Sequence, residues 1–272
     1  MAMPRHSRAS PQQSKLVRTM SHTSFAPPYH SHAHVHEQIR NHGFAVLQPR
    51  DVALWLGTTL EALQQLQVDW DNLPADTFLR DGGSYRYRRH ACFVVRQGVV
   101  EIAPHRAHWQ PVDYNALHGG MHRMFAPMLE RTVTAPAWQQ LVAQLAALSN
   151  ALFCPEDSTA PCFVEAHQFR IDTAQGIGRP TPEGAHRDGV DLVAVFLVQR
   201  ENIKGGETRV FEAHGPAGQR FTLTQPWSVL LLDDARMIHE TTPIQPEGAA
   251  GVRDTLVVTC RRGGFQDEAA GA

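Results

Sequence analysis

Short β-rich runs fill the C-terminal half of the chain, and they restrict the possible fold more than any other feature of the sequence. They cover 163–171, 190–198, 208–212, 227–232, 237–244 and 254–261, and turns rich in Gly, Pro and Asp separate them. Helices do not alternate with these runs in the regular βαβ order of a parallel sheet. Short strands joined by turns are typical of an antiparallel sandwich or jelly roll.

The N-terminal half predicts helices that precede this β-rich region. After a strand over 43–47, Asp51 is a candidate N-cap, and apolar residues at mostly helical spacing predict one amphipathic helix over 51–68. A strand over 85–95 and helices over 121–131 and 136–153 follow. Helices that come first and strands that come second indicate an α+β fold, with N-terminal helices packed on a mostly antiparallel β core.

The first 36 residues differ in composition from the rest of the chain. They contain Lys and Arg but no acidic residue, they are rich in Ser, Pro and His, and they show no sustained apolar period. Such a segment buries little apolar surface, so we expect 1–36 to be a flexible tail. The remaining 37–272 have the size of a single folded domain.

Composition excludes two classes of partner. The formal net charge is −2 and no long basic run occurs, so a nucleic-acid ligand is not expected. The longest strongly apolar stretch, 190–198, is far shorter than the roughly 20 residues that cross a bilayer, so no membrane association is expected. Four cysteines without a CxxC pair predict reduced thiols and a cytoplasmic protein. The expected partner is a small molecule, and a homodimer stays an open alternative.

Three residues in two distant segments form a candidate metal site. His186 and Asp188 stand two positions apart before an apolar run, and at that spacing an extended chain turns both side chains toward one face. His239 lies in the later strand over 237–244 and offers a third ligand. Two histidines and one carboxylate on one face of an octahedron leave three positions open, which suits non-heme Fe(II) that reacts with oxygen.

Arg253 heads the last predicted strand and is a candidate anion ligand. A period of two places Arg253, Thr255 and Thr259 on one face of that strand, and Leu256 and Val258 on the other. A guanidinium binds a carboxylate through two parallel hydrogen bonds, and a hydroxyl two residues later can add a third. This face therefore predicts a seat for a dicarboxylic cosubstrate.

The order of these motifs resembles the Fe(II)/2-oxoglutarate-dependent dioxygenase superfamily. More narrowly, the sequence is similar to the bacterial group that contains L-isoleucine 4-hydroxylase. The segments that carry this similarity are 181–191, 200–203, 205–208, 232–234 and 253–254, within a broader likeness over 43–261. An HxD motif alone is weak, whereas all these segments in order are a specific signature.

The resemblance implies a double-stranded β-helix with iron at one open end, bound by His186, Asp188 and His239 as the catalytic centre. It also implies that Arg253, together with Thr255, holds the distal carboxylate of 2-oxoglutarate, and that O2 is the other cosubstrate. The implied activity is hydroxylation of an unactivated C–H bond in a small molecule. A free or N-substituted aliphatic L-amino acid is the expected substrate, and succinate and CO2 are the expected coproducts.

Four further side chains are candidate substrate ligands. Gln168 and Arg170 share one face of the strand over 163–171, and Arg86 belongs to a similar pair in the strand over 85–95. An inward Arg suits the carboxylate of an amino acid. Thr208 enters the next strand at a position that could line the pocket, while Arg261 and Arg262 compete with Arg253 for the cosubstrate.

Two other functions are compatible with the same motifs. The first is a non-catalytic metal-binding sensor or stress-associated protein on this scaffold, against which the complete set of three ligands argues. The second is a cupin-like metalloenzyme that works without 2-oxoglutarate. A visible charge-transfer band from anaerobic Fe(II) and 2-oxoglutarate separates them from the dioxygenase, because the band forms only when the keto acid chelates the iron.

Overall fold

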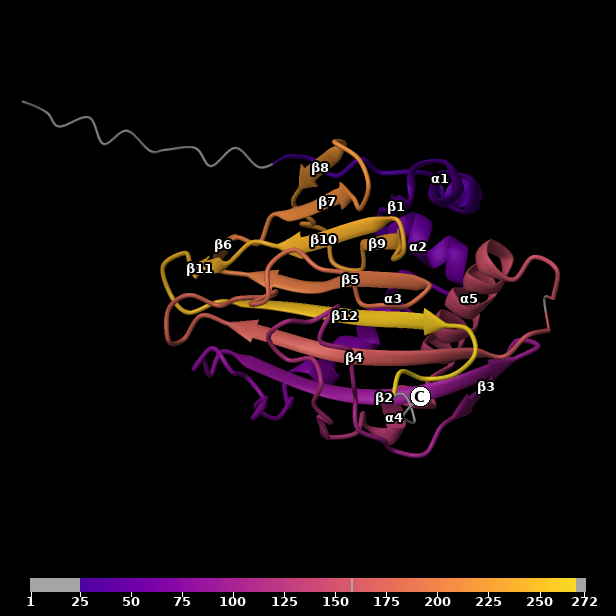
Figure 1. The fold of residues 1–272 in the computed structure, drawn as a ribbon. Coiled ribbons are helices and arrows are strands. Elements are labelled where there is room, and N and C mark those ends of the chain that lie inside the picture. Colours follow the sequence, from indigo (N-terminus) through magenta and orange to yellow (C-terminus); the bar gives the residue numbers. More distant parts are fainter. Residues whose placement is uncertain (1–24, 158, 268–272) are drawn as a thin grey trace, which may run out of the picture.

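The computed structural model describes residues 25–157 and 159–267, and a seven-stranded antiparallel sheet dominates it (Figure 1). Its strand order is β1-β9-β5-β12-β4-β2-β3. The strands are β1 (Phe44–Leu47), β9 (Val229–Asp233), β5 (Leu192–Glu201), β12 (Val252–Arg261), β4 (Cys162–Asp172), β2 (Arg86–Arg96) and β3 (Val99–Ile102). The pairing of non-consecutive strands brings the last strand, β12, between β4 and β5 at the centre of the sheet.

Two smaller antiparallel sheets complete the β core. One has the order β10-β7-β8, and the other pairs β11 with β6. Their strands are β10 (Met237–Thr241), β7 (Thr208–Glu212), β8 (Gly218–Phe221), β11 (Ile244–Pro246) and β6 (Ile203–Gly205). A cavity lies between the large sheet and β10, and side chains of β2, β4, β12 and β10 line it. The antiparallel core with separate helices confirms the predicted α+β class.

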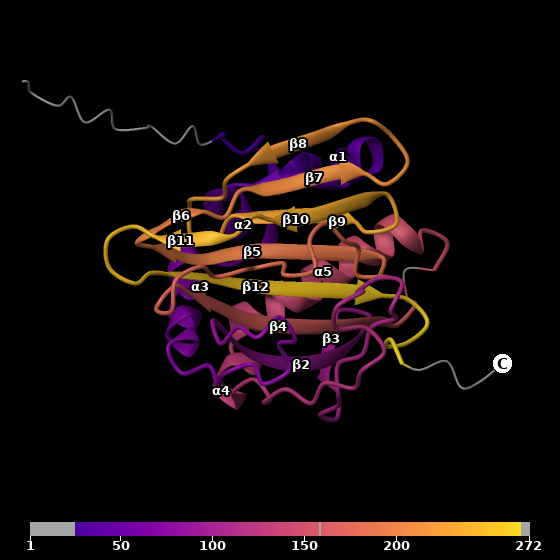
Figure 2. The ribbon, with the colours of Figure 1, turned by 60° about the vertical axis from the view of Figure 1, so that its left-hand side comes forward.

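The helices cover the face of the large sheet that is turned away from the cavity, and Figure 2 shows them behind the strands. The principal helix, α5 (Pro136–Phe153), begins with Pro at its first position, where the missing N–H costs nothing. Its stripe of Trp138, Leu141 and Leu145 is fully buried, and Trp138 packs on Phe93 of β2. Within the described residues, no helix has the length and apolar character needed to cross a bilayer.

The predicted helix over 51–68 is broken into three pieces. These are α2 (Pro49–Leu56), α3 (Leu60–Gln65) and the 3-10 helix η2 (Leu66–Trp70). Gly57 ends α2 in the left-handed conformation, with φ of 67°, and the Thr59 hydroxyl accepts the Ala62 N–H to start α3. Glycine adopts this backbone without strain, so a break costs little here although the apolar spacing continues across it.

The other predicted helix boundaries also shift. The helix expected over 121–131 is reduced to α4 (Glu130–Val133), because the preceding residues pair as extended chain, Arg123 with His108 and Pro127 with His90. At the N-terminal side, the 3-10 helix η1 (His32–His34) lies before the expected domain start at residue 37, and α1 (Val35–His42) spans it. Folded structure thus begins before that boundary, while residues 1–24 of the expected tail lie outside the described part of the chain.

The two faces of β4 and β12 serve different purposes. The odd-numbered residues of both strands line the cavity, whereas Gln168 and Arg170 do not. Arg170 lies opposite Asp254 on the helix side and forms two hydrogen bonds with its carboxylate, at 2.8 and 2.7 Å. This placement corrects the expectation that Gln168 and Arg170 reach the cavity. Arg170 instead neutralises a fully buried carboxylate.

Replacing Arg170 by Ala should therefore destabilise the fold. Burial raises the pKa of Asp254 while Arg170 opposes that rise, so removal of Arg170 leaves an unpaired buried charge. We expect a loss of about 3–5 kcal/mol at neutral pH, measured by urea unfolding. The loss should shrink as the pH falls toward the pKa of Asp254, because the protonated form carries no charge to bury. Adding Asp254→Asn to Arg170→Ala should recover part of the lost stability. A loss below about 1 kcal/mol in Arg170→Ala alone would mean that the pair behaves as a surface ion pair.

Candidate metal centre and active site

A two-residue backbone bridge brings the predicted ligands together. His186 and His239 pair in antiparallel fashion, and each N–H donates to the carbonyl of the other at 3.0 Å. Their rings lie 4.6 Å apart, and Asp188 completes a group whose possible ligand atoms all lie within 4.8 Å of one another. His186 Nε2 lies 3.9 Å from Asp188 Oδ1, and His239 Nε2 lies 3.9 Å from Asp188 Oδ2. All three side chains face the cavity.

The chemistry of this donor set fits a divalent metal ion. His186 Nδ1 lies 3.0 Å from the carbonyl oxygen of Gly184, which accepts its hydrogen and leaves the Nε2 lone pair directed toward Asp188. Burial lowers the pKa of His239 to about 4, with the neighbouring His186 acting in the same direction, so this ring is neutral at physiological pH. Two imidazoles and one carboxylate are the ligand types that non-heme Fe(II) takes.

The carboxylate of Asp188 is held from two sides. Gln110 donates its Nε2–H to Oδ1 at 3.0 Å, so one oxygen is already engaged. Asp234 accepts the backbone N–H groups of Asp188, Gly189 and Val190, at 2.7 to 3.0 Å, and thereby fixes the loop that carries the carboxylate. Burial and the charge of Asp188 raise the pKa of Asp234 to about 7. The three backbone donors stabilise its ionised form against that effect.

Arg253 is a buried cation with no ion pair among the described residues. Only 4% of the residue is exposed, it lines the cavity with Thr255, and no described residue hydrogen-bonds or ion-pairs with its guanidinium. Burial and nearby Arg200 lower its pKa to about 10. Of its two rivals, Arg261 lines the cavity but donates to the Gly264 carbonyl, and Arg262 lies outside it, paired with Asp191. Arg253 is thus the best placed of the three to receive an anion.

The remaining candidate side chains divide between the cavity and the core. Arg86 lines the cavity next to Arg88, and its Nε donates to Asp76 at 2.7 Å. Thr208 is buried where β7 pairs with Thr241 of β10, and it is not part of the cavity lining. This corrects the expectation that Thr208 lines the pocket. Thr208 and Thr241 are opposite partners on one face of the ladder, and the cavity is lined by Thr241 of β10, whereas β7 lies one strand further away.

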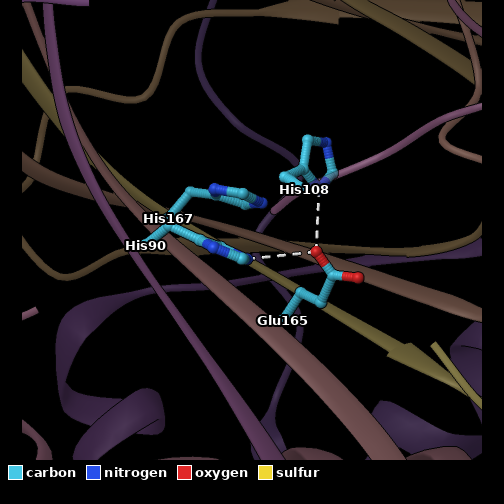
Figure 3. A group of neighbouring side chains, drawn as sticks. All are labelled: His90, His108, Glu165 and His167. Atoms are coloured by element: carbon cyan, nitrogen blue, oxygen red, sulfur yellow. Dashed lines mark hydrogen bonds and ion pairs between the residues drawn. The ribbon is translucent and has the colours of Figure 1, made fainter. Parts of the chain in front are cut away.

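A second cluster of metal-ligand residue types lies on the wall formed by β2 and β4 (Figure 3). His108 Nδ1 and His90 Nε2 lie 2.7 and 3.1 Å from the same oxygen of Glu165. Because a carboxylate only accepts, both nitrogens carry hydrogen. Arg88 donates to His167 Nδ1 at 2.6 Å, which places the hydrogen of this ring on Nε2. The two nitrogens that face Glu165 thus offer hydrogens to its carboxylate, and the cluster solvates one buried acid.

Protonation equilibria agree with this interpretation of the second cluster. Burial alone would raise the pKa of Glu165, but His108 and His90 lower it well below its usual range. Burial lowers the pKa of His90 to about 4 and also lowers those of His108 and His167. The cluster is therefore an ionised carboxylate among neutral imidazoles at physiological pH.

Several residues of the site were missed by the sequence analysis. Gln110 and Arg123 lie in a segment whose only regular feature was a predicted helix, and the pairing of His108 with Arg123 is what brings them to the cavity. Arg123 donates to Gln110 Oε1 at 2.9 Å and so orients the amide that holds Asp188. Glu183 also lines the cavity, and its position three residues before His186 was the only available signal.

Comparison with known proteins identifies the family. Residues 67–259 match the family model described as 2OG-Fe dioxygenase. A bsmA homolog from Methylobium petroleophilum PM1 is 48% identical over 90% of this chain and 98% of its own, with a TM-score of 0.84. IDO from Bacillus thuringiensis is 19% identical over 87% of this chain and all of its own, with a TM-score of 0.70.

A third structure and a negative result complete the comparison. The Fe(II)/(alpha)ketoglutarate-dependent dioxygenase TqaL is 18% identical over 85% of this chain and 87% of its own, with a TM-score of 0.61. No curated protein matches the chain. The more distant structures share the fold, which confirms the expected jelly roll, a double-stranded β-helix. The chain belongs to the 2OG-Fe dioxygenase family and is a dioxygenase that depends on Fe(II), 2-oxoglutarate and O2.

Proposed function

We propose that this protein hydroxylates an unactivated C–H bond of a free or N-substituted aliphatic L-amino acid, with release of succinate and CO2. The observation that carries the proposal is the meeting of His186, Asp188 and His239 in one cavity with the unpaired cation of Arg253. The sequence similarity to the bacterial group that contains L-isoleucine 4-hydroxylase supports the amino-acid class.

The four free, buried cysteines support a cytoplasmic location.

In this proposal each residue has one task. His186, His239 and Asp188 would hold the iron, with the His186 ring oriented by Gly184 and the Asp188 carboxylate by Gln110. Bound iron, with 2-oxoglutarate and O2, supplies the oxidising power for C–H hydroxylation. Arg253 pairs with the distal carboxylate of 2-oxoglutarate, and Thr255, on the same face of β12, adds a hydroxyl donor. The apolar side chains of Val195 and Val257 exclude water from the same cavity.

The carboxylate of Asp188 is the first point to test. Asp188→Ala removes the only anionic ligand of the set, so we expect it to abolish succinate formation from 2-oxoglutarate. The anaerobic charge-transfer band of the Fe(II) and 2-oxoglutarate complex should disappear with it. Asp191→Ala, three residues later and outside the cavity, is the matched control and should keep the band. Succinate formation that survives Asp188→Ala would remove the role assigned to this carboxylate.

The loop support from Asp234 predicts a second effect on metal binding. Asp234→Ala leaves three backbone N–H groups next to Asp188 without their acceptor. Losing a group that orients a metal ligand costs about 10- to 100-fold in metal affinity, and we expect a loss of this size in an Fe(II) titration. Hydrogen exchange of the amides at 188–190 should also accelerate. Asp233→Asn serves as the control, and an unchanged Fe(II) affinity in Asp234→Ala would contradict the assignment.

Arg253 should act on the cosubstrate rather than on the metal. We expect Arg253→Ala to weaken 2-oxoglutarate binding about 10- to 100-fold, the range for loss of a charged hydrogen-bonding partner, with little change in Fe(II) affinity. Titration of the charge-transfer band measures the first quantity, and metal competition measures the second. Arg262→Ala is the control, because this residue is paired with Asp191 outside the cavity. Equal 2-oxoglutarate affinity in Arg253→Ala and wild type would transfer the role to Arg261.

A further inference from the structure

We propose that Arg123 and Glu183 recognise the substrate as a zwitterion, with Arg123 binding its carboxylate and Glu183 binding a free α-ammonium group. This inference rests on the proposed amino-acid hydroxylation, and it decides between the two substrate forms left open there. A free amino acid should bind, and its N-acylated derivative should be rejected. The cavity wall formed by Arg86, Arg88, Arg123 and Glu183 contains buried polar atoms that have no partner within the described residues.

The unpartnered atoms of this wall belong to both signs of charge. On the cationic side they are Arg86 Nη2, Arg88 Nε and Arg123 Nε, and on the anionic side Glu183 Oε2. Buried polar atoms in folded proteins almost always have a hydrogen-bond partner, so a wall with several orphans indicates a missing ligand. Because donors and an acceptor are both left over, that ligand must supply an acceptor and a donor.

Of the three arginines with unpartnered atoms, Arg123 is the one without an ion pair to a carboxylate among the described residues. Arg86 donates to Asp76 at 2.7 Å, and Arg88 lies 3.7 Å from the same carboxylate. Arg123 hydrogen-bonds only to the neutral amide of Gln110, although just 2% of the residue is exposed. A buried guanidinium that is hydrogen-bonded to no carboxylate is costly, and a substrate carboxylate would relieve that cost.

Among the described acidic side chains of the cavity, Glu183 is the one with a buried oxygen that has no hydrogen-bond partner. Glu165 is already solvated by His90 and His108 (Figure 3), and Asp188 is held by Gln110 beside the two histidines of the metal centre. Glu183 Oε1 lies 3.7 Å from His186 Nε2, whereas its Oε2 is buried and has no partner. An ammonium group placed here would sit beside the metal centre, within reach of the reacting region.

Acylation of the amine would remove both features that this site recognises. An amide nitrogen has no charge and one hydrogen in place of three, so the buried Oε2 of Glu183 would stay without a charged hydrogen-bond donor. The acyl group would also have to occupy space next to the metal ligands. The site therefore discriminates by leaving its own carboxylate unpaired when the wrong substrate binds, which is a strong form of rejection.

The experiment compares matched probes on the anaerobic Fe(II) and 2-oxoglutarate complex. L-isoleucine and L-leucine, their N-acetyl derivatives, and the amines that lack the carboxylate are titrated while the charge-transfer band is followed. We expect the free amino acids to shift the band at concentrations about 10- to 100-fold lower than either altered form. Tighter binding of the N-acetyl forms overturns the role of Glu183, and equal binding of the amines overturns that of Arg123.

Variants test whether Glu183 causes the preference for free over N-acetyl amino acids. Glu183→Gln keeps the shape and removes the charge, so we expect the preference for free over N-acetyl amino acids to fall about tenfold or more. Glu156→Gln, an exposed site outside the cavity, is the matched control and should leave the preference unchanged. An unchanged preference in Glu183→Gln would overturn the assignment. The charge-transfer band itself reports whether this variant still assembles its iron centre.

Failure of this inference differs visibly from failure of the proposed function. If the wild-type protein forms no charge-transfer band, the proposed function fails and the zwitterion site fails with it. If the band forms but neither amino acid shifts it in any form, only the zwitterion site is overturned, while iron and 2-oxoglutarate binding stand.

Discussion

The pairing of His186 with His239 is the constraint on which the rest of the site depends. Two backbone hydrogen bonds of 3.0 Å join an irregular turn to the edge strand β10, and they place two imidazoles side by side. The backbone of the turn is held in place by Asp234, which accepts three consecutive N–H groups. Because the side chains follow from the backbone register, a shift of one residue at this bridge would turn both rings away from Asp188. The metal centre is therefore a property of strand pairing, and the surrounding side chains refine it.

A continuous polar network links this centre to the opposite wall of the cavity. Gln110 holds Asp188, Arg123 and Asn115 hold Gln110, and His108, two residues before Gln110, belongs to the cluster around Glu165. The segment that carries these residues has little regular structure, and the pairing of His108 with Arg123 keeps it in place. Buried networks of this kind are stable only when nearly every member has a partner. Of the buried side-chain atoms that have no partner, those of Arg86, Arg88, Arg123 and Glu183 belong to residues that line the cavity.

The sequence was informative wherever local periodicity determines the outcome. The stripe of α5 and the alternation along β12, with Arg253 and Thr255 on one face and Leu256 on the other, follow from chain geometry alone. Prediction failed where both faces of an element are buried. In β4 the polar residues Gln168 and Arg170 point to the helix side, because Asp254 on the neighbouring strand supplies the charge partner. No pattern within β4 reveals that partner. The helix over 51–68 failed for a different reason, since Gly57 permits a left-handed turn that apolar spacing does not register.

The buried charge of Arg253 also affects the stability of the folded protein. Its charge lies inside the fold with no ion pair among the described residues, so the empty protein carries a penalty that a dicarboxylate bound in the proposed way would remove. A ligand that binds only the native state raises the free energy of unfolding in proportion to the logarithm of its concentration. Bound 2-oxoglutarate would thus increase the stability of the folded protein. In cells that run short of 2-oxoglutarate, the protein would lose its activity and would also be degraded sooner by proteases.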